Sequence, residues 1–172
     1  ADGALTPSAQ EIDGRMSTGL AADGLPPKWF TKNPDTTFGE DLVDMVQVMR
    51  SACDLALQTA ASATVFDLWR DLYAQQEEWA ESTDQPPLLW ALGVSQVERA
   101  VIDAFCRDGG IPFSEALRSN AFGIRLGDLY SELADSVPSS LLPEDPVRSG
   151  ITLSGPQDRL VVGSGWYGTQ FR

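Results

Sequence analysis

The sequence predicts an α+β fold that is rich in helices, with a small antiparallel meander, complete or truncated, packed on a helical bundle. Three observations lead to this fold class. Apolar residues recur at three- and four-residue spacing through residues 38–107, which is the period of amphipathic helices. Glycines, prolines and capping residues divide that stretch into separate helices. A short segment ahead of it contains an Asp-Gly turn pair, which is typical of hairpins.

The N-terminal segment is expected to contribute one short strand and a loop. Asp13 and Gly14 form the turn pair, so residues 15–20 are predicted to be a strand whose preceding partner is poorly formed or missing. Residues 1–10 are small and polar and include Gly and Pro, which favours a loose start. Three prolines fix the loop at residues 25–34, because each restricts its own backbone and that of the residue before it.

The first long helix is predicted at residues 38–61. Thr37 and Glu40 directly ahead of it have the spacing of a capping box, in which each residue satisfies a free N–H group of the other. A second capping pattern, Thr-x-x-Asp, follows a break in the apolar period. It predicts a second helix over residues 64–82.

A third helix is expected from residue 88 or 89 to residue 107, where Gly109 and Gly110 stop it. Its buried face is expected to consist of Val94, Val97, Val101, Ala104 and Phe105. Pro112 opens a short fourth helix that reaches about residue 118. Residues 124–133 are a candidate fifth helix.

The composition changes after residue 135, which divides the chain into residues 1–135 and residues 136–172. The second part is predicted to be a linker and an unassigned tail, because its first half has three prolines and no periodicity. Its end is expected to hold short strands at residues 151–153 and 159–162.

Charge and composition disfavour several classes of function. The chain of 172 residues has 25 acidic and 12 basic residues and a net charge of −13, whereas nucleic acids and anionic membranes both need clustered cations. Histidine is absent, which excludes histidine-dependent triads and histidine zinc sites. Two cysteines are too few for a disulfide scaffold, so a cytoplasmic protein is expected. Buried free thiols at Cys53 and Cys106 are favoured over a disulfide between them.

Cations and aromatic residues meet in the loop at residues 25–34. The candidate ligand-contact residues are Lys28, Trp29, Phe30 and Lys32. On the functional interpretation, the lysines contact an anionic ligand while the aromatic rings close over it. On the structural interpretation, the aromatic side chains anchor the loop to the helices.

The remaining charged clusters are assigned to structure rather than to chemistry. Asp41 and Asp44 lie on a helix face among other charges, and we expect them to be solvated. Arg99 and Asp103 are four residues apart on the third helix and are expected to form a local ion pair. No residue of the chain is assigned a catalytic or metal-binding role.

The segment VERAVIDAFCRDGGIPFSEALR, residues 97–118, resembles the end of the N-terminal capping domain in the enolase superfamily, in its mandelate racemase/muconate lactonizing enzyme-like branch. In that family a helix of the type A-x-x-D/E-A-L-x-D-x-x-x-K is followed by a Gly-Pro turn and a short helix. The comparable places here are filled by Glu98, Ala100, Ile102, Asp103, Gly110, Pro112 and Leu117. Residues 14–42 resemble the last strand of the capping meander and its loop, so the resemblance covers roughly residues 11–125.

The resemblance implies that residues 1–135 are a capping domain, either complete or truncated at its N-terminus, that shapes substrate access as a lid. In the family, a (β/α)₈-like barrel carries the metal-binding carboxylates and the Lys or His acid–base groups, and no residue of this chain matches them. The implied parent reaction is Mg²⁺-assisted proton abstraction next to a carboxylate, by a racemase, cycloisomerase or dehydratase. The implied partners are the barrel domain and a small carboxylate substrate, with residues 25–34 nearest the substrate. The chain itself is then expected to bind no cofactor and not to be catalytic alone.

Two other functions remain open from the residues. A standalone acidic helical module that binds a protein partner fits the net charge and the tryptophan-rich helices. A self-contained enzyme that uses only Asp, Glu, Lys and Tyr is the third. The native reading frame discriminates the first two, because a capping domain continues into a barrel and a standalone module does not.

Overall fold

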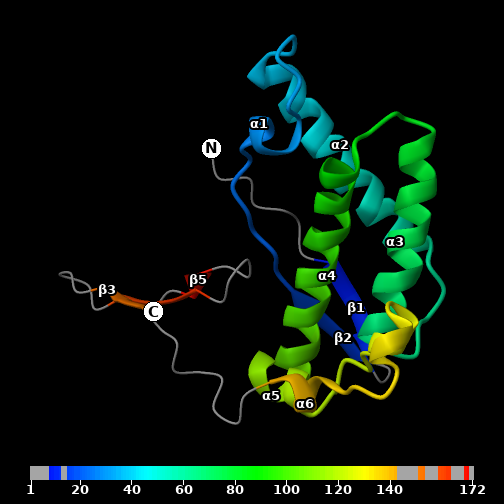
Figure 1. The fold of residues 1–172 in the computed structure, drawn as a ribbon, viewed down its shortest axis with the longest axis vertical. Helices are drawn as coiled ribbons and strands as arrows, with labels where there is room; N and C mark the ends of the chain where they lie inside the picture. The colour runs from blue at the N-terminus through cyan, green and yellow to red at the C-terminus, as the bar shows by residue number, and fades with distance from the viewer. Residues whose placement is uncertain (1–7, 13–14, 143–150, 154–158, 164–168, 171–172) are drawn as a thin grey trace.

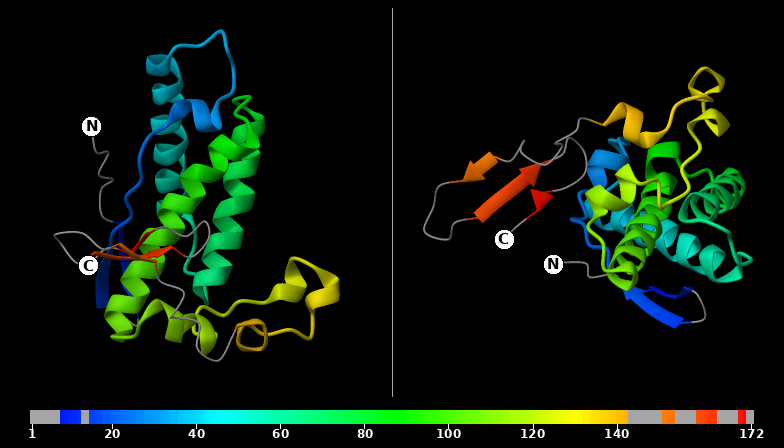
Figure 2. Two further views of the ribbon diagram at one scale, coloured as in Figure 1. Left: turned by 60° about the vertical axis from the view of Figure 1, so that its left-hand side comes forward. Right: turned by 90° about the horizontal axis from the view of Figure 1, so that it is seen from below.

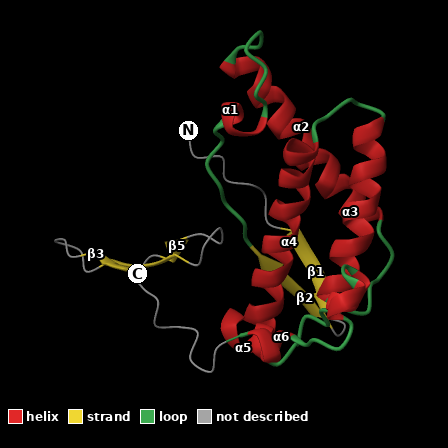
Figure 3. Ribbon diagram, in the orientation of Figure 1, coloured by secondary structure: helices red, strands yellow, loops and turns green. Residues whose placement is uncertain are grey.

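Helices dominate the computed structural model, which describes residues 8–12, 15–142, 151–153, 159–163 and 169–170 (Figure 1). The three long helices are α2 (Phe38–Gln58), α3 (Val65–Glu81) and α4 (Pro87–Gly109). They run alternately up and down and form an antiparallel bundle (Figure 3). The short helices are α1 (Pro27–Phe30), α5 (Phe113–Arg118) and α6 (Pro138–Leu141). The predicted helix-rich bundle is confirmed.

A two-stranded antiparallel hairpin precedes the helices. Strand β1 (Ser8–Ile12) pairs with β2 (Arg15–Gly19) along the full length of both, with Ser8 opposite Gly19. The hairpin lies alongside α4 (Figure 2). The expectation that the partner strand is poorly formed or missing is therefore wrong, and so is that of a loose chain at residues 8–10. The residues of β1 have weak strand propensity, and the strand is formed through main-chain hydrogen bonds to β2. The turn pair at residues 13–14 lies outside the described residues.

Helix α4 is the central element, since α2, α3 and both strands of the hairpin contact it. The buried core is built around Met45, Val48, Leu72, Leu89, Trp90, Val94, Val97 and Val101. The predicted buried face of this helix is confirmed except at Phe105, which is half-buried and lies with its ring centroid 5.4 Å from that of Phe122.

Two glycines determine how closely the neighbouring elements approach α4. A Cβ atom on Gly93 would lie 2.3 Å from the carbonyl oxygen of Val48, so α2 and α4 cross in backbone contact. A Cβ atom on Gly19 would lie 1.9 Å from the carbonyl oxygen of Ala100. Ser17 adds a hydrogen bond from its hydroxyl to the carbonyl of Ala104 at 3.1 Å. The C-terminal half of α4 thus holds the hairpin at close range.

The starts of α2 and α3 and the end of α4 follow the predicted capping signals. Thr37 N–H donates to Glu40 Oε2 at 2.8 Å, and Glu40 N–H donates to Thr37 Oγ1 at 3.4 Å, which completes the capping box of α2. Helix α4 stops at Gly110, whose φ of 61° lies in the left-handed region that glycine enters without strain. Helix α2 ends at Gln58 rather than at residue 61, because Thr59 adopts extended backbone angles.

Residues beyond α5 depart most from the prediction. The candidate helix at 124–133 is instead two 3₁₀ turns, η1 (Leu126–Asp128) and η2 (Ser131–Leu133). Gly123, just ahead of these turns, has a left-handed φ of 70°, which is incompatible with a continuous α-helix. Helix α6 lies in the segment predicted to be a linker and opens with Pro138 in its first turn.

The C-terminal strands form a sheet of their own. It is antiparallel, in the order β3-β4-β5, with β3 (Ile151–Leu153), β4 (Arg159–Gly163) and β5 (Thr169–Gln170). The first two match the predicted strands, and the third was not predicted.

Cys53 and Cys106 are free thiols, as expected, but they are half-buried rather than buried, and this burial raises the pKa of both. Within the described residues, no helix combines the length and the apolar character needed to cross a bilayer.

Candidate functional site

The predicted ligand-contact residues lie on α1 and on the turn that leads into α2. Lys28 is the structural centre of this region. Its Nζ lies 2.7 Å from Asp41 Oδ2 and donates to the carbonyl oxygens of Asn33, at 2.8 Å, and Thr36, at 2.6 Å. It also lies 3.0 Å from Thr36 Oγ1. One ammonium group therefore closes the turn between α1 and α2.

Asp41 is buried, which corrects the expectation that it is solvated. It lies in the first turn of α2, where the positive end of the helix dipole favours a carboxylate. The Lys28 ammonium and the Thr36 hydroxyl hold the pKa of Asp41 below its usual value. A buried carboxylate needs such a partner, because desolvation otherwise disfavours its charge. The pair therefore anchors the loop.

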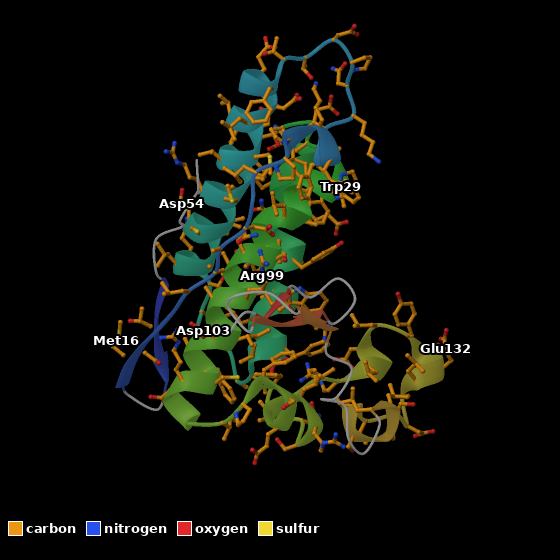
Figure 4. All side chains as sticks on the ribbon, turned by 90° about the vertical axis from the view of Figure 1, so that its left-hand side faces the viewer. Met16, Trp29, Asp54, Arg99, Asp103 and Glu132 are labelled. Atoms are coloured by element: carbon orange, nitrogen blue, oxygen red, sulfur yellow. The ribbon has the colours of Figure 1, made fainter. Side chains whose placement is uncertain are left out.

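The other three candidate residues divide between the surface and the core. Trp29 is 69% exposed and Lys32 is also exposed, whereas Phe30 is half-buried and packs against the core. Figure 4 labels Trp29, which projects from α1. The segment predicted as a loop therefore contains a short helix, in which Lys28 and Phe30 hold the segment in place, whereas Trp29 and Lys32 face outward. Only the outward pair is positioned to meet a ligand without rearrangement of the loop.

A second polar arrangement, which the sequence did not reveal, holds the chain between β2 and α1 against α4. Asp103 Oδ2 accepts from the backbone N–H of Leu20 at 2.9 Å. Arg99 Nη2 donates to Asp23 Oδ2 at 2.9 Å, and Gln96 Nε2 lies 3.4 Å from the same oxygen. The three side chains of α4 are spaced i, i+3 and i+7 and form one polar stripe beside the apolar face. Figure 4 labels Arg99 and Asp103 on this helix.

Arg99 and Asp103 do not pair with each other, contrary to expectation. Arg107 Nε contacts Asp103 Oδ2 at 2.9 Å instead, one turn further along α4. Two polar atoms of this stripe make no hydrogen bond, since Gln96 Oε1 and Arg99 Nε are both buried without a partner in the described residues. Polar residues at helical spacing on an otherwise apolar helix were the available signal, but they do not identify Asp23 as the partner.

A third network joins the η1 turn to the start of α3. Arg125 contacts Asp67 and Asp128 through different nitrogens, and Arg70 contacts Asp128 as well. The guanidinium carbon of Arg125 lies 5.2 Å from the ring centroid of Phe66. Asp67 also accepts from the hydroxyl of Thr64 at 2.7 Å. This network holds η1 against the first turns of α3.

The three networks described above position segments of the chain against one another. Among the described residues, no three Asp, Glu or Cys side chains converge into a group that could hold a metal ion. Burial raises the pKa of the Glu98 carboxyl, while the adjacent Arg99 acts in the opposite direction. Its side chain lies on α4 and is only partly accessible.

Comparison of the chain with models of known families, with curated proteins and with solved structures found no match.

Proposed function

We propose that this chain is the capping domain of an enolase-superfamily-like protein of the mandelate racemase/muconate lactonizing enzyme-like branch. The observation that carries the proposal is the helix–turn–helix segment of α4 and α5. Its long helix stops at a left-handed Gly110, and Pro112 immediately precedes a short second helix. The family's capping domain has the same succession at its end. The antiparallel hairpin packed on α4 supports the proposal, because the family's meander occupies that position in the chain order.

The role of such a domain is to shape access to a substrate held elsewhere. Trp29 and Lys32, exposed on an anchored loop, provide an aromatic surface and a cation that suit a small carboxylate substrate. The Lys28–Asp41 pair supports this role, since it holds the loop in one conformation before a ligand arrives. Trp29 and Lys32 then contribute affinity and specificity, and the chain contributes no acid or base.

The parent reaction in this proposal is proton abstraction next to a carboxylate, leading to racemisation, cycloisomerisation or dehydration in the cytoplasm. The metal would be Mg²⁺, which stabilises the negative charge that develops on the substrate carboxylate. The described residues of this chain do not fit that ion, because they offer no convergent carboxylate group. Metal and acid–base groups belong to the barrel in this proposal, and the barrel domain is the partner of this chain.

The test combines the native gene with an exchange assay. The reading frame is expected to encode a barrel with spaced metal-binding carboxylates downstream of Arg172. The purified chain with Mg²⁺ in D₂O is expected to leave the α-protons of carboxylates unexchanged by NMR, and the longer protein is expected to exchange them. Turnover by the chain alone, through its own residues, would overturn the proposal.

The loop is tested in the longer protein. Trp29→Ala and Lys32→Ala are expected to raise KM several-fold with little change in kcat, because they remove binding contacts rather than reacting groups. Equal losses of kcat in both variants would contradict a lid role.

A standalone acidic module that binds a protein partner is the second candidate function. It is favoured by the large apolar side chains that α2 exposes, Phe38, Val43 and Leu57. A stop codon directly after Arg172 in the native gene would select this alternative.

A further inference from the structure

An apolar groove with two opposite charges at its middle runs along the outer face of α2. Its volume is about 720 Å³. Leu42, Val46, Leu55 and Trp79 form its apolar walls, and Arg50 and Asp54 line its centre. Val43 lines one end of the groove and is 65% exposed, and Leu57, which lies near the end of α2 outside the lining, is 81% exposed. Val46, Leu55 and Trp79 also pack against the core, whereas Val43, Arg50 and Asp54 leave the outer side of this strip exposed.

The two charges at the centre of the groove are also unused. Arg50 and Asp54 are one helical turn apart, and neither side chain has an ion-pair partner among the described residues. A cation that precedes an anion by four residues has the less favourable orientation for pairing within one helix. Both charges are therefore available to a second molecule. Figure 4 labels Asp54, which projects outward from α2.

We propose that a second copy of this chain covers the groove, with the two α2 helices antiparallel about a twofold axis that crosses them between Arg50 and Asp54. A twofold interface is self-complementary, so a contact from residue i to residue j is repeated from j to i. Arg50 then meets Asp54 of the second copy, and Asp54 meets its Arg50. The same register places Leu57 of one copy over Val46 and Gln47 of the other.

The local charges of the groove, unlike the net charge of the chain, fit a second copy as the occupant. Two chains that each carry a net charge of −13 repel one another over most of their surfaces. The groove is an exception, because one cation and one anion line it and it is neutral. Helix α2 has 21 residues and is therefore about 31 Å long, which gives room for a continuous antiparallel contact. A basic partner would instead be drawn to the acidic remainder of the surface.

The experiment is sedimentation equilibrium of the 172-residue chain over a wide concentration range. Wild type is expected to form a reversible dimer. Arg50→Glu and Asp54→Arg are each expected to weaken it about tenfold or more, since each change replaces two attractive contacts by two repulsive ones. The double variant Arg50→Glu/Asp54→Arg restores both pairs with reversed signs and is expected to return the dissociation constant to within about threefold of wild type.

Two further variants separate this surface from general effects. Glu77→Arg changes the charge of the chain by the same amount as Asp54→Arg but lies on an exposed part of α3 outside the groove, so it is expected not to weaken the dimer. Leu57→Asp is expected to weaken it, and its 81% exposure leaves the fold intact. The proposal is overturned by a monomer at every concentration, by single reversals that leave the dimer unchanged, or by a double variant that does not recover. A monomer whose groove is covered by another segment of a longer native chain overturns it equally. The inference is independent of the capping-domain proposal, because it rests on the groove formed by α2 and Trp79 of α3 and not on the family resemblance.

Discussion

The side-chain amide of Gln76 donates a hydrogen bond to the main-chain carbonyl of Val48 at 3.0 Å, and Gln76 is fully buried. This bond links the middle of α3 to the middle of α2. The same carbonyl is the atom that a Cβ on Gly93 of α4 would approach to 2.3 Å. The three long helices thus meet around one peptide group, which makes this point the centre of the bundle.

Gln76→Ala is expected to lower the free energy of unfolding by about 2 to 4 kcal/mol, because it removes a buried hydrogen bond and opens a cavity. Gln76→Leu keeps most of the volume and also removes Oε1, which is buried without a partner among the described residues, so its loss is expected to be smaller. Urea denaturation measures both values. The assignment fails if the two variants lose equal stability or if the alanine variant matches wild type.

Gly93→Ala is expected to destabilise the protein by several kcal/mol, since the new methyl group would force α2 and α4 apart at backbone level. Gly39→Ala is the matched control. Gly39 lies in α2, and a Cβ atom there would meet no other atom within 4 Å, so alanine is expected to stabilise by about 0.5 to 1 kcal/mol through helix propensity. Thermal unfolding of the two variants should shift in opposite directions, and a shared direction would contradict the close approach.

The long helices were predictable from the sequence because their signals are local. The capping box at Thr37 and Glu40 and the glycine stop at Gly110 each act within a few residues, and both are present where they were expected. The limits of prediction appear where a contact joins distant residues. In the sequence, Asp41 is one of several charged residues at the start of a helix. Its burial and its contact with Lys28 depend on the folded structure.

The same reasoning applies to the candidate site. Lys28, Trp29, Phe30 and Lys32 were expected in one loop, but the first three lie in the short helix α1. The period of a four-residue helix is too short to tell which of them faces inward. The link from Arg99 to Asp23 spans 76 residues and has no local signature. Residues 124–133 were misassigned, and the contact of Arg125 with Asp67, which joins this segment to α3, likewise has no local signature.

Stability is expected to fall at acidic pH through Asp67. Hydrogen bonds from Arg125 and Thr64 hold the pKa of this carboxyl below its usual value of about 3.9. Because the folded-state pKa is the lower one, the contribution is complete above the unfolded pKa and is lost as pH falls through the folded value. Asp67→Asn is expected to flatten the decrease in the free energy of unfolding below about pH 5.

Urea titrations at a series of pH values measure this slope for wild type and variant. Asp71→Asn serves as the control, because Asp71 is exposed on the same helix and has no ion-pair partner in the described residues. If the free energy of unfolding of Asp67→Asn depends on pH as that of wild type does, the Arg125 network does not contribute to stability.

Lys28→Met is expected to release the loop between α1 and α2, because it leaves the buried Asp41 carboxylate without its counter-charge. The midpoint of urea unfolding should fall, and the amides of residues 28–37 should exchange faster with solvent. Adding Asp41→Leu to the same chain removes the orphaned charge and is expected to recover part of the lost midpoint, since an apolar pair can replace a buried ion pair. Lys32→Met is the matched control and is expected to change neither measurement, as Lys32 is exposed. If the double variant is less stable than Lys28→Met alone, the two side chains do not act as a pair, and the loop is held by Phe30 and the three prolines instead.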